Sequence, residues 1–107
     1  MINWQEKTDP EINNAVKLVL ISKHEKESDF DKFFLKLLKC SDLDYCNNPA
    51  FSWTIIQRAR ISLEFHGRDC TASARVAKGL FIDEVSVFTH KNPLRAAMIV
   101  FLMMNEK

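Results

Sequence analysis

The C-terminal segment His90–Met104 constrains the fold more than any other part of the chain. It reads HKNPLRAAMIVFLMM, and its apolar residues run almost unbroken from Ala96 onward. Asn92 and Pro93 predict a helix start, because Asn can accept from the first free N–H groups and Pro at the first helical position has no N–H to leave unpaired. A helix that is apolar nearly all round must be buried on most sides. The run is too short to cross a bilayer, which needs about 20 residues, so we expect a central core helix.

The composition is typical of one globular domain. The chain has 107 residues, of which 47% are hydrophobic and 27% charged, and its net charge is +1. That charge is too balanced to indicate a nucleic-acid or membrane partner by itself. Cys40, Cys46 and Cys70 follow an N-terminus that has no apolar leader segment, which favours free thiols in a reducing cytoplasm.

Two amphipathic helices are predicted in the first half. Thr8–Glu11 has the pattern of a capping box, and apolar residues then recur at helical spacing, which predicts a helix from about residue 9 to 22. These residues are Ile12, Ala15, Val16, Val19 and Leu20. After a charged link, a second such pattern begins at Ser28 or Asp29 and runs through Cys40. We expect the two helices to form a hairpin.

The second half begins with a third helix and then changes its period. Asn48-Pro49 repeats the Asn-Pro start and predicts a helix from Pro49 to about Ala59, with Trp53 and Ile56 inward. Alternation then predicts three strands, with a turn at 67–69 between the first two. The expected alternating sets are Ile61, Leu63 and Phe65; then Cys70, Ala72, Ala74 and Val76; and then Val85 and Val87 opposite Ser86 and Phe88.

This element order predicts an α+β fold in a single domain, residues 1–107. Residues 1–45 form the helical N-terminal part, and residues 46–107 form an α-β-β-β-α part. A three-stranded antiparallel sheet has a face that must be covered. We expect the C-terminal helix to cover it, with another helix on its far side.

Catalytic and metal-binding patterns are weak. The His and Cys spacings include no CxxC and no HxxxH, so we expect neither a metal site nor a cofactor. His66 and Cys70 flank the first hairpin turn and could form a thiol–imidazole pair. Because no third group orients that pair, we expect a protein that is not an enzyme and keep thiol chemistry at His66 and Cys70 as the alternative.

Basic residues gather at two helix ends. His90, Lys91 and Arg95 lie at the predicted start of the last helix, where free N–H groups and the helix dipole favour anions. Arg58 and Arg60 lie at the end of the third helix. We predict these five as candidate binding residues, the alternative at each end being a merely hydrated helix terminus.

The end of the last helix is a second candidate surface. Leu102, Met103 and Met104 would protrude if that helix were longer than the sheet beneath it, and could then hold a partner or a second copy of the chain. The sequence is compatible with either a monomer or a homodimer.

Three segments resemble the NinX-like proteins of lambdoid phages and prophages. They are DYCNNPAFSWTIIQRARISLEF (44–65), KNPLRAAMIVFLMM (91–104) and TDPEINNAVKLVL (8–20). Segments 23–39 and 79–89 depart from the family pattern. The resemblance implies a small α/β sandwich of unknown biochemical activity, located in the cytoplasm of the bacterial host, and brings no catalytic residues.

Two functions are compatible with these observations. The first is a phage accessory protein that binds a host or phage macromolecule, most simply a protein, and so modulates host defence or replication. The second is a nucleic-acid-binding module, because α-β-β-β-α is the element order of a double-stranded-RNA-binding domain, where basic residues at the last helix contact phosphates. Only Lys91 and Arg95 stand there, and phosphate binding needs several cations. A membrane partner is not expected.

Overall fold

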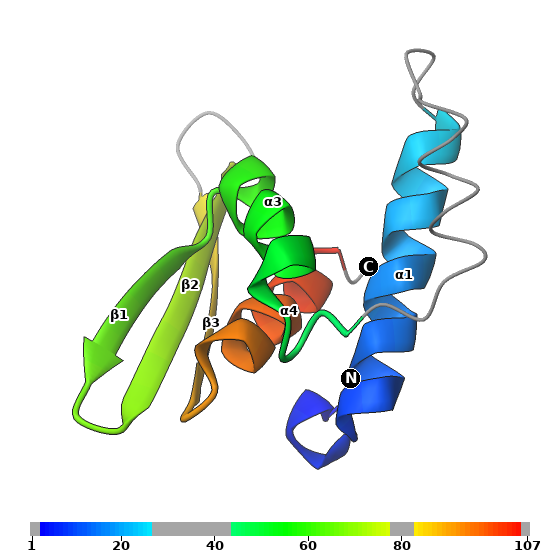
Figure 1. The fold of residues 1–107 in the computed structure, drawn as a ribbon. Coiled ribbons are helices and arrows are strands. Elements are labelled where there is room, and N and C mark those ends of the chain that lie inside the picture. The colour runs from blue at the N-terminus through cyan, green and yellow to red at the C-terminus, as the bar shows by residue number, and fades with distance from the viewer. Residues whose placement is uncertain (1–2, 27–43, 78–82, 106–107) are drawn as a thin grey trace.

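A computed structural model describes residues 3–26, 44–77 and 83–105 as an α+β fold (Figure 1). Its elements are a short 3₁₀ helix Trp4–Glu6, α1 Asp9–Lys26, α3 Pro49–Ala59, β1 Ser62–His66, β2 Asp69–Ala77, β3 Asp83–His90 and α4 Pro93–Met104. The predicted α-β-β-β-α order with the sheet packed on the C-terminal helix is confirmed. The second helix of the predicted N-terminal hairpin lies outside the described residues.

Each predicted helix start that falls within the described residues has the expected cap. The Thr8 backbone N–H donates to the Glu11 carboxylate at 3.0 Å, and the Glu11 N–H donates back to the Thr8 hydroxyl at 3.4 Å, which is a capping box. The Asn48 side chain accepts from the Ala50 N–H at 3.0 Å. The Asn92 side chain accepts from the backbone N–H groups of two residues in the first turn of α4. These caps fix where α1, α3 and α4 begin.

The sheet is an antiparallel meander in the order β1-β2-β3, so β1 and β3 are both edge strands. His66 pairs with Asp69 across a two-residue turn, in which Gly67 has φ +59°. A positive φ at the first central position fits a type II′ turn, which favours Gly there. The turn predicted at residues 67–69 is confirmed.

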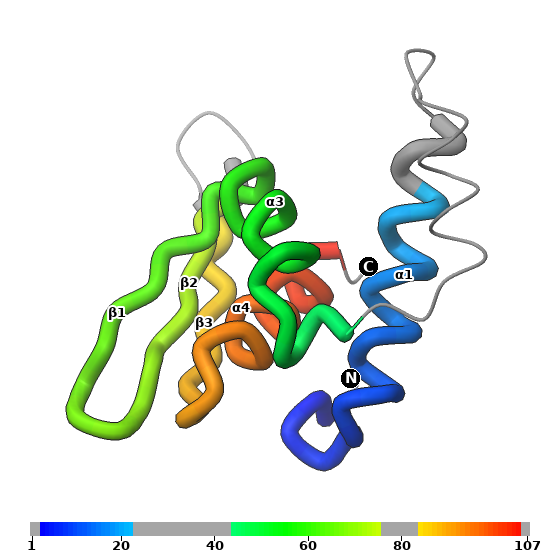
Figure 2. Tube along the Cα trace, in the orientation of Figure 1, coloured from blue at the N-terminus to red at the C-terminus, as the bar shows by residue number. Residues whose placement is uncertain are grey.

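Helix α4 is the centre of the fold. One side packs on β2 and β3, α3 lies alongside, and α1 packs on the far side from the sheet (Figure 2). Every residue from Arg95 to Leu102 is buried. Ile12 and Val16 of α1 are also fully buried against this core. The expectation drawn from the apolar run, a helix covered on both sides, is therefore confirmed.

Two aromatic residues lie differently from the prediction. Trp53 is 54% exposed, because Ser52, Ile55 and Ile56 form the buried stripe of α3 and Trp53 lies about 110° round the helix from its centre. Phe65 shares the helix-covered face of the sheet with Ile61, yet it is 67% exposed. Burial along β1 falls toward the hairpin turn, because β1 is the edge strand away from α4, which packs on β2 and β3 (Figure 1).

Candidate functional site

The start of α4 is a polar junction that joins three parts of the chain. The Asn92 side-chain amide donates to the Cys46 carbonyl at 2.8 Å and to the Asn47 side chain at 3.2 Å. Asn47 in turn donates to the Asp9 carboxylate at 3.1 Å. The residues that precede α3 are thereby tied to the starts of α1 and α4, and the junction has the character of a structural brace.

Arg95 belongs to this brace. Arg95 is only 8% exposed, and its guanidinium donates to the Asp9 carboxylate and to the Lys7 carbonyl. Partial burial acts to raise the pKa of Asp9, but hydrogen bonds from Asn47 and Arg95 outweigh it and hold that pKa below its usual value. An anion arriving at this helix end would therefore have to compete with a carboxylate that is already in place.

The other two predicted residues at this end differ in exposure. Lys91 is exposed, whereas His90 is half-buried and its Nδ1 accepts the Asn92 backbone N–H at 2.9 Å. Burial, aided by the charges of Arg95 and Lys91, lowers the pKa of His90 and favours the neutral ring that can accept this bond. Of the three, Lys91 is the residue that extends into solvent.

Arg58 and Arg60 lie at the opposite end of α3 from this junction. Asn48 and its neighbours lie beside the start of α4, and the 11-residue helix then carries the chain about 16 Å away before the two arginines. Both are exposed. The five predicted basic residues thus form two separate groups and do not make one site.

The end of α4 is not the protruding surface predicted for Leu102–Met104. Leu102 is 2% exposed, and Met103 and Met104 are half-buried against the hydrophobic core. Leu102 belongs to the same buried core as residues of α1, α3 and β2, so it does not protrude as predicted.

The two described cysteines are free and buried. Cys70 pairs in register with Phe65, and His66 with Asp69, so the side chains of Cys70 and His66 point to opposite faces of the sheet. The structure therefore does not bring the predicted thiol–imidazole pair together. Burial, reinforced by the nearby Asp9 carboxylate, raises the pKa of Cys46 to about 12, where the thiol is a poor nucleophile.

Within the described segments, no three His, Cys, Asp or Glu side chains gather closely enough to hold a metal ion. No helix among the same residues is both long and apolar enough to cross a membrane.

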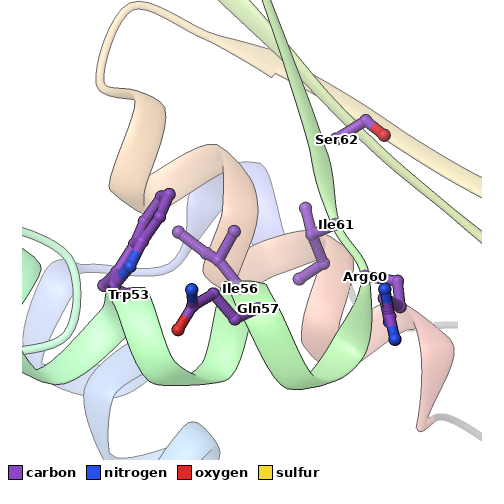
Figure 3. Close-up of a pocket in the computed structure, with 6 residues that line it drawn as sticks. All are labelled: Trp53, Ile56, Gln57, Arg60, Ile61 and Ser62. Carbon is purple, nitrogen blue, oxygen red and sulfur yellow. The ribbon is translucent and has the colours of Figure 1, made fainter.

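A groove lies between α3 and the start of β1 (Figure 3). It is open, has a volume of about 580 Å³, and is lined by Trp53, Ile56, Gln57, Arg60, Ile61 and Ser62. Trp53 stands at one end, with Arg60 and Ser62 at the other (Figure 3). Ile56 and Ile61 are buried and form an apolar floor.

The local sequence builds this groove through the end of α3. The Ile61 N–H donates to the Ile56 carbonyl at 3.0 Å, and the Arg60 N–H donates to the Gln57 carbonyl at 3.3 Å. These two bonds form a Schellman motif, whose apolar contact here joins Ile56 and Ile61. Arg60 occupies the left-handed position of the motif, with φ 58° and ψ 44°. Gly is the usual residue there, since it carries no Cβ.

The charge of the groove comes from Arg60 alone, because the other five lining residues are uncharged. In the described part of the chain, no acidic side chain pairs with Arg60. The groove therefore presents an apolar floor, an exposed indole and a guanidinium that no described carboxylate pairs with. Trp and Arg are the residue types most enriched at the energetic centres of protein interfaces.

Sequence reasoning identified Arg60 but missed the groove. It placed Trp53 inside and assigned no role to Gln57 or Ser62. The adjacent Ile55 and Ile56 were the available signal, because they fix the buried stripe of α3 and leave Trp53 and Gln57, four residues apart, on an outer face. The lining contributed by β1 depends on the turn after α3, which sequence spacing does not specify.

Comparison with known proteins identifies a family. Curated proteins and solved structures give no match. The family model described as "Bacteriophage P22, NinX" matches residues 7–105. That range runs through segments 23–39 and 79–89 as well as the three segments that carry the resemblance. The chain therefore belongs to the NinX family of bacteriophage proteins.

Proposed function

We propose that this NinX-family chain is a phage accessory protein that acts in the host cytoplasm by binding a protein through the α3–β1 groove. The observation that carries the proposal is Trp53, which leaves 54% of its surface in solvent above the buried Ile56 and Ile61. Covering a Trp side chain on an apolar floor removes a large area from water. The partner is a host or phage protein of defence or replication.

The groove composition supports a protein partner. Its floor is apolar, its rim carries the polar side chains of Gln57 and Ser62, and Arg60 supplies one charge. Protein interfaces share this arrangement of an apolar centre, a polar rim and an Arg or Trp anchor.

Quantitative affinity capture from phage-infected cells tests the proposal. Trp53→Ala removes the anchor while leaving the buried stripe of α3 intact. Leu18→Ala is the matched control, because Leu18 is 58% exposed and lies on α1. We expect the parent chain and Leu18→Ala to recover the same protein, and Trp53→Ala to lower its yield about tenfold or more. Equal recovery by the two variants, both shown to be folded by circular dichroism, would contradict the proposal.

Nucleic-acid binding is the second candidate, favoured by the observed α-β-β-β-α order. In double-stranded-RNA-binding domains, basic residues of this layout contact phosphates across the minor groove. Here Lys91 and, in the β1–β2 turn, Arg68 are exposed, but Arg95 is held by Asp9 and α1 packs against α4. A gel shift with duplex RNA and DNA at low salt tests it. A shift that weakens with salt and is lost in Lys91→Ala would favour this function, and no shift at micromolar protein would exclude it.

A further inference from the structure

We propose that the groove receives an extended, acidic segment of the partner protein, which pairs with the open edge of β1 and presents a carboxylate to Arg60. This inference rests on the proposed protein-binding function and specifies the chemistry of the partner. Three independent observations support it: the charge of the groove, the backbone conformation of Arg60, and the exposed edge of β1.

The first observation is charge complementarity. Arg60 is exposed and is the one charged residue that lines the groove. No carboxylate among the described residues pairs with it. A guanidinium binds a carboxylate through two parallel hydrogen bonds, which gives both affinity and direction. A segment with an acidic residue at this end of the groove therefore complements the surface, whereas a basic segment would be repelled.

The second observation is that Arg60 occupies a position where Gly would be less strained. Its left-handed backbone conformation disfavours any residue with a Cβ. A cation near the C-terminus of a helix interacts favourably with the helix dipole, but Arg58 already supplies one in the last turn of α3. The helix dipole therefore does not explain why position 60 is an arginine. A residue held in an unfavourable backbone conformation at a surface groove indicates a role for its side chain.

The third observation is the open edge of β1. In the described sheet β1 pairs only with β2, and no described element lies outside it (Figure 1). The backbone groups on that edge are therefore available to an added strand. Ser62, the first residue of β1, also lines the groove, so the groove and the edge are continuous.

An apolar track follows the same edge. Ile61, Leu63 and Phe65 share one face of the sheet and change from buried to half-buried to exposed along β1. Ile61 and Phe65 are separated by about 13 Å along the strand. An extended segment with apolar side chains at alternate positions would cover this track, while its acidic residue lies at the Arg60 end.

Selection from a displayed library of random peptides of about 12 residues tests the inference on the full chain. We expect the parent chain to select peptides that join alternating apolar residues to an Asp or Glu. Arg60→Glu reverses the charge on a shorter side chain, and it should select Lys or Arg at or next to the same peptide position. Arg60→Gly should weaken binding of the parent-selected peptides about tenfold while raising the Tm by about 4 °C, so lost binding cannot be ascribed to misfolding.

The remaining outcomes separate this inference from the proposed function. One outcome would overturn the inference but leave the groove as a protein-binding site. In that outcome the selected peptides show no acidic preference, and Arg60→Glu selects the same motif as the parent chain. The peptides nevertheless fail to bind Trp53→Ala. Peptides that bind Trp53→Ala as well as the parent, or no selection at all, would overturn both. Displacement of the peptides by a duplex RNA of about 16 base pairs would overturn both in favour of nucleic acid.

Discussion

The guanidinium of Arg95, in the first turn of α4, donates to the carboxylate of Asp9 in the first turn of α1. This contact joins the outer helix of the fold to its central helix at the same end as the Asn47 and Asn92 bridges. The predicted anion-binding arginine thus has an anion supplied by its own chain. The junction at the start of α4 joins the layers, and the groove at the far end of α3 is the binding surface that we propose.

Removing Arg95 should strongly destabilise the fold. Arg95→Ala deletes the bonds to Asp9 and to the Lys7 carbonyl at a site that is nearly closed to water. We expect the free energy of unfolding to fall by about 2–3 kcal/mol, less than for a fully buried pair because Asp9 is partly exposed. Urea denaturation measures this value. The exposed Lys7–Glu11 pair is the control. Glu11→Gln removes the charge of that pair but keeps an oxygen that can accept from Thr8, so it should have a much smaller effect. Equal losses in both variants would show that Arg95 does not brace the layers.

Tyr45→Phe should stabilise the protein. The Tyr45 hydroxyl is buried and has no hydrogen-bond partner among the described residues, and burial raises its pKa to about 12. Deleting an unsatisfied buried hydroxyl should raise the free energy of unfolding by about 1 kcal/mol. Ser52→Ala is the contrasting variant, because the buried Ser52 hydroxyl donates to the Asn48 carbonyl at 3.3 Å, and its loss should destabilise. If Tyr45→Phe were destabilising, the hydroxyl would have to be bonded.

Arg60→Gly should also stabilise, in contrast to the same substitution two residues earlier. At position 60 Gly relieves the left-handed backbone of an L-residue, which we expect to gain about 1 kcal/mol. At position 58, inside α3, Arg→Gly should cost about 1 kcal/mol because Gly is a poor helix former. Thermal unfolding of the two variants gives the comparison. Destabilisation by both would show that Arg60 is not strained.

Acidification should weaken the fold in two separate pH windows. Burial and the charges of Arg95 and Lys91 depress the pKa of His90, against weaker opposing effects of Asp9 and Asp69. As the pH falls, His90 is therefore protonated in the unfolded chain before it is protonated in the folded one. The contribution of His90 to the free energy of unfolding is complete above its ordinary pKa of 6.5 and is lost as the pH falls below that value. The depressed pKa of Asp9 acts lower, with stability lost below its ordinary value of 3.8.

Urea titrations between about pH 8 and pH 5 isolate the histidine contribution. His90→Asn keeps an acceptor near the Asn92 N–H but does not titrate, so its stability should vary less across this range than that of the parent chain. A parallel decline in both proteins would assign the pH dependence to other groups.

Local signals predicted much of the fold. The Thr8–Glu11 capping box and the two Asn-Pro pairs placed three helix starts, since each cap depends on residues within one turn. The buried face of α1 followed from its spacing. The prediction ended α1 near residue 22, but the helix continues to Lys26, because the Lys and Glu residues of the predicted link are good helix formers.

The candidate binding surface was harder to predict because it depends on contacts between distant residues. Arg95 and Asp9 are 86 positions apart, and Asn92 and Cys46 are 46 apart, so no local spacing shows that Arg95 is already occupied. Trp53 was placed inside on hydrophobicity alone, although Ile55 and Ile56 already fill the inward face of α3. The left-handed conformation of Arg60 follows from the motif that ends α3, where sequence alone would favour Gly.

The central claim is that a protein partner contacts the groove, and site-specific photo-cross-linking in phage-infected cells tests it most directly. A photoreactive phenylalanine analogue replaces Gln57, which lines the groove, or Leu18, which is also exposed but lies on α1, away from the groove. We predict that the analogue at position 57 forms one discrete adduct with a host or phage protein. The adduct should disappear when Trp53→Ala is introduced into the same chain, and the analogue at position 18 should form no adduct of that mass. The same adduct from both positions, or none from position 57, would contradict the claim.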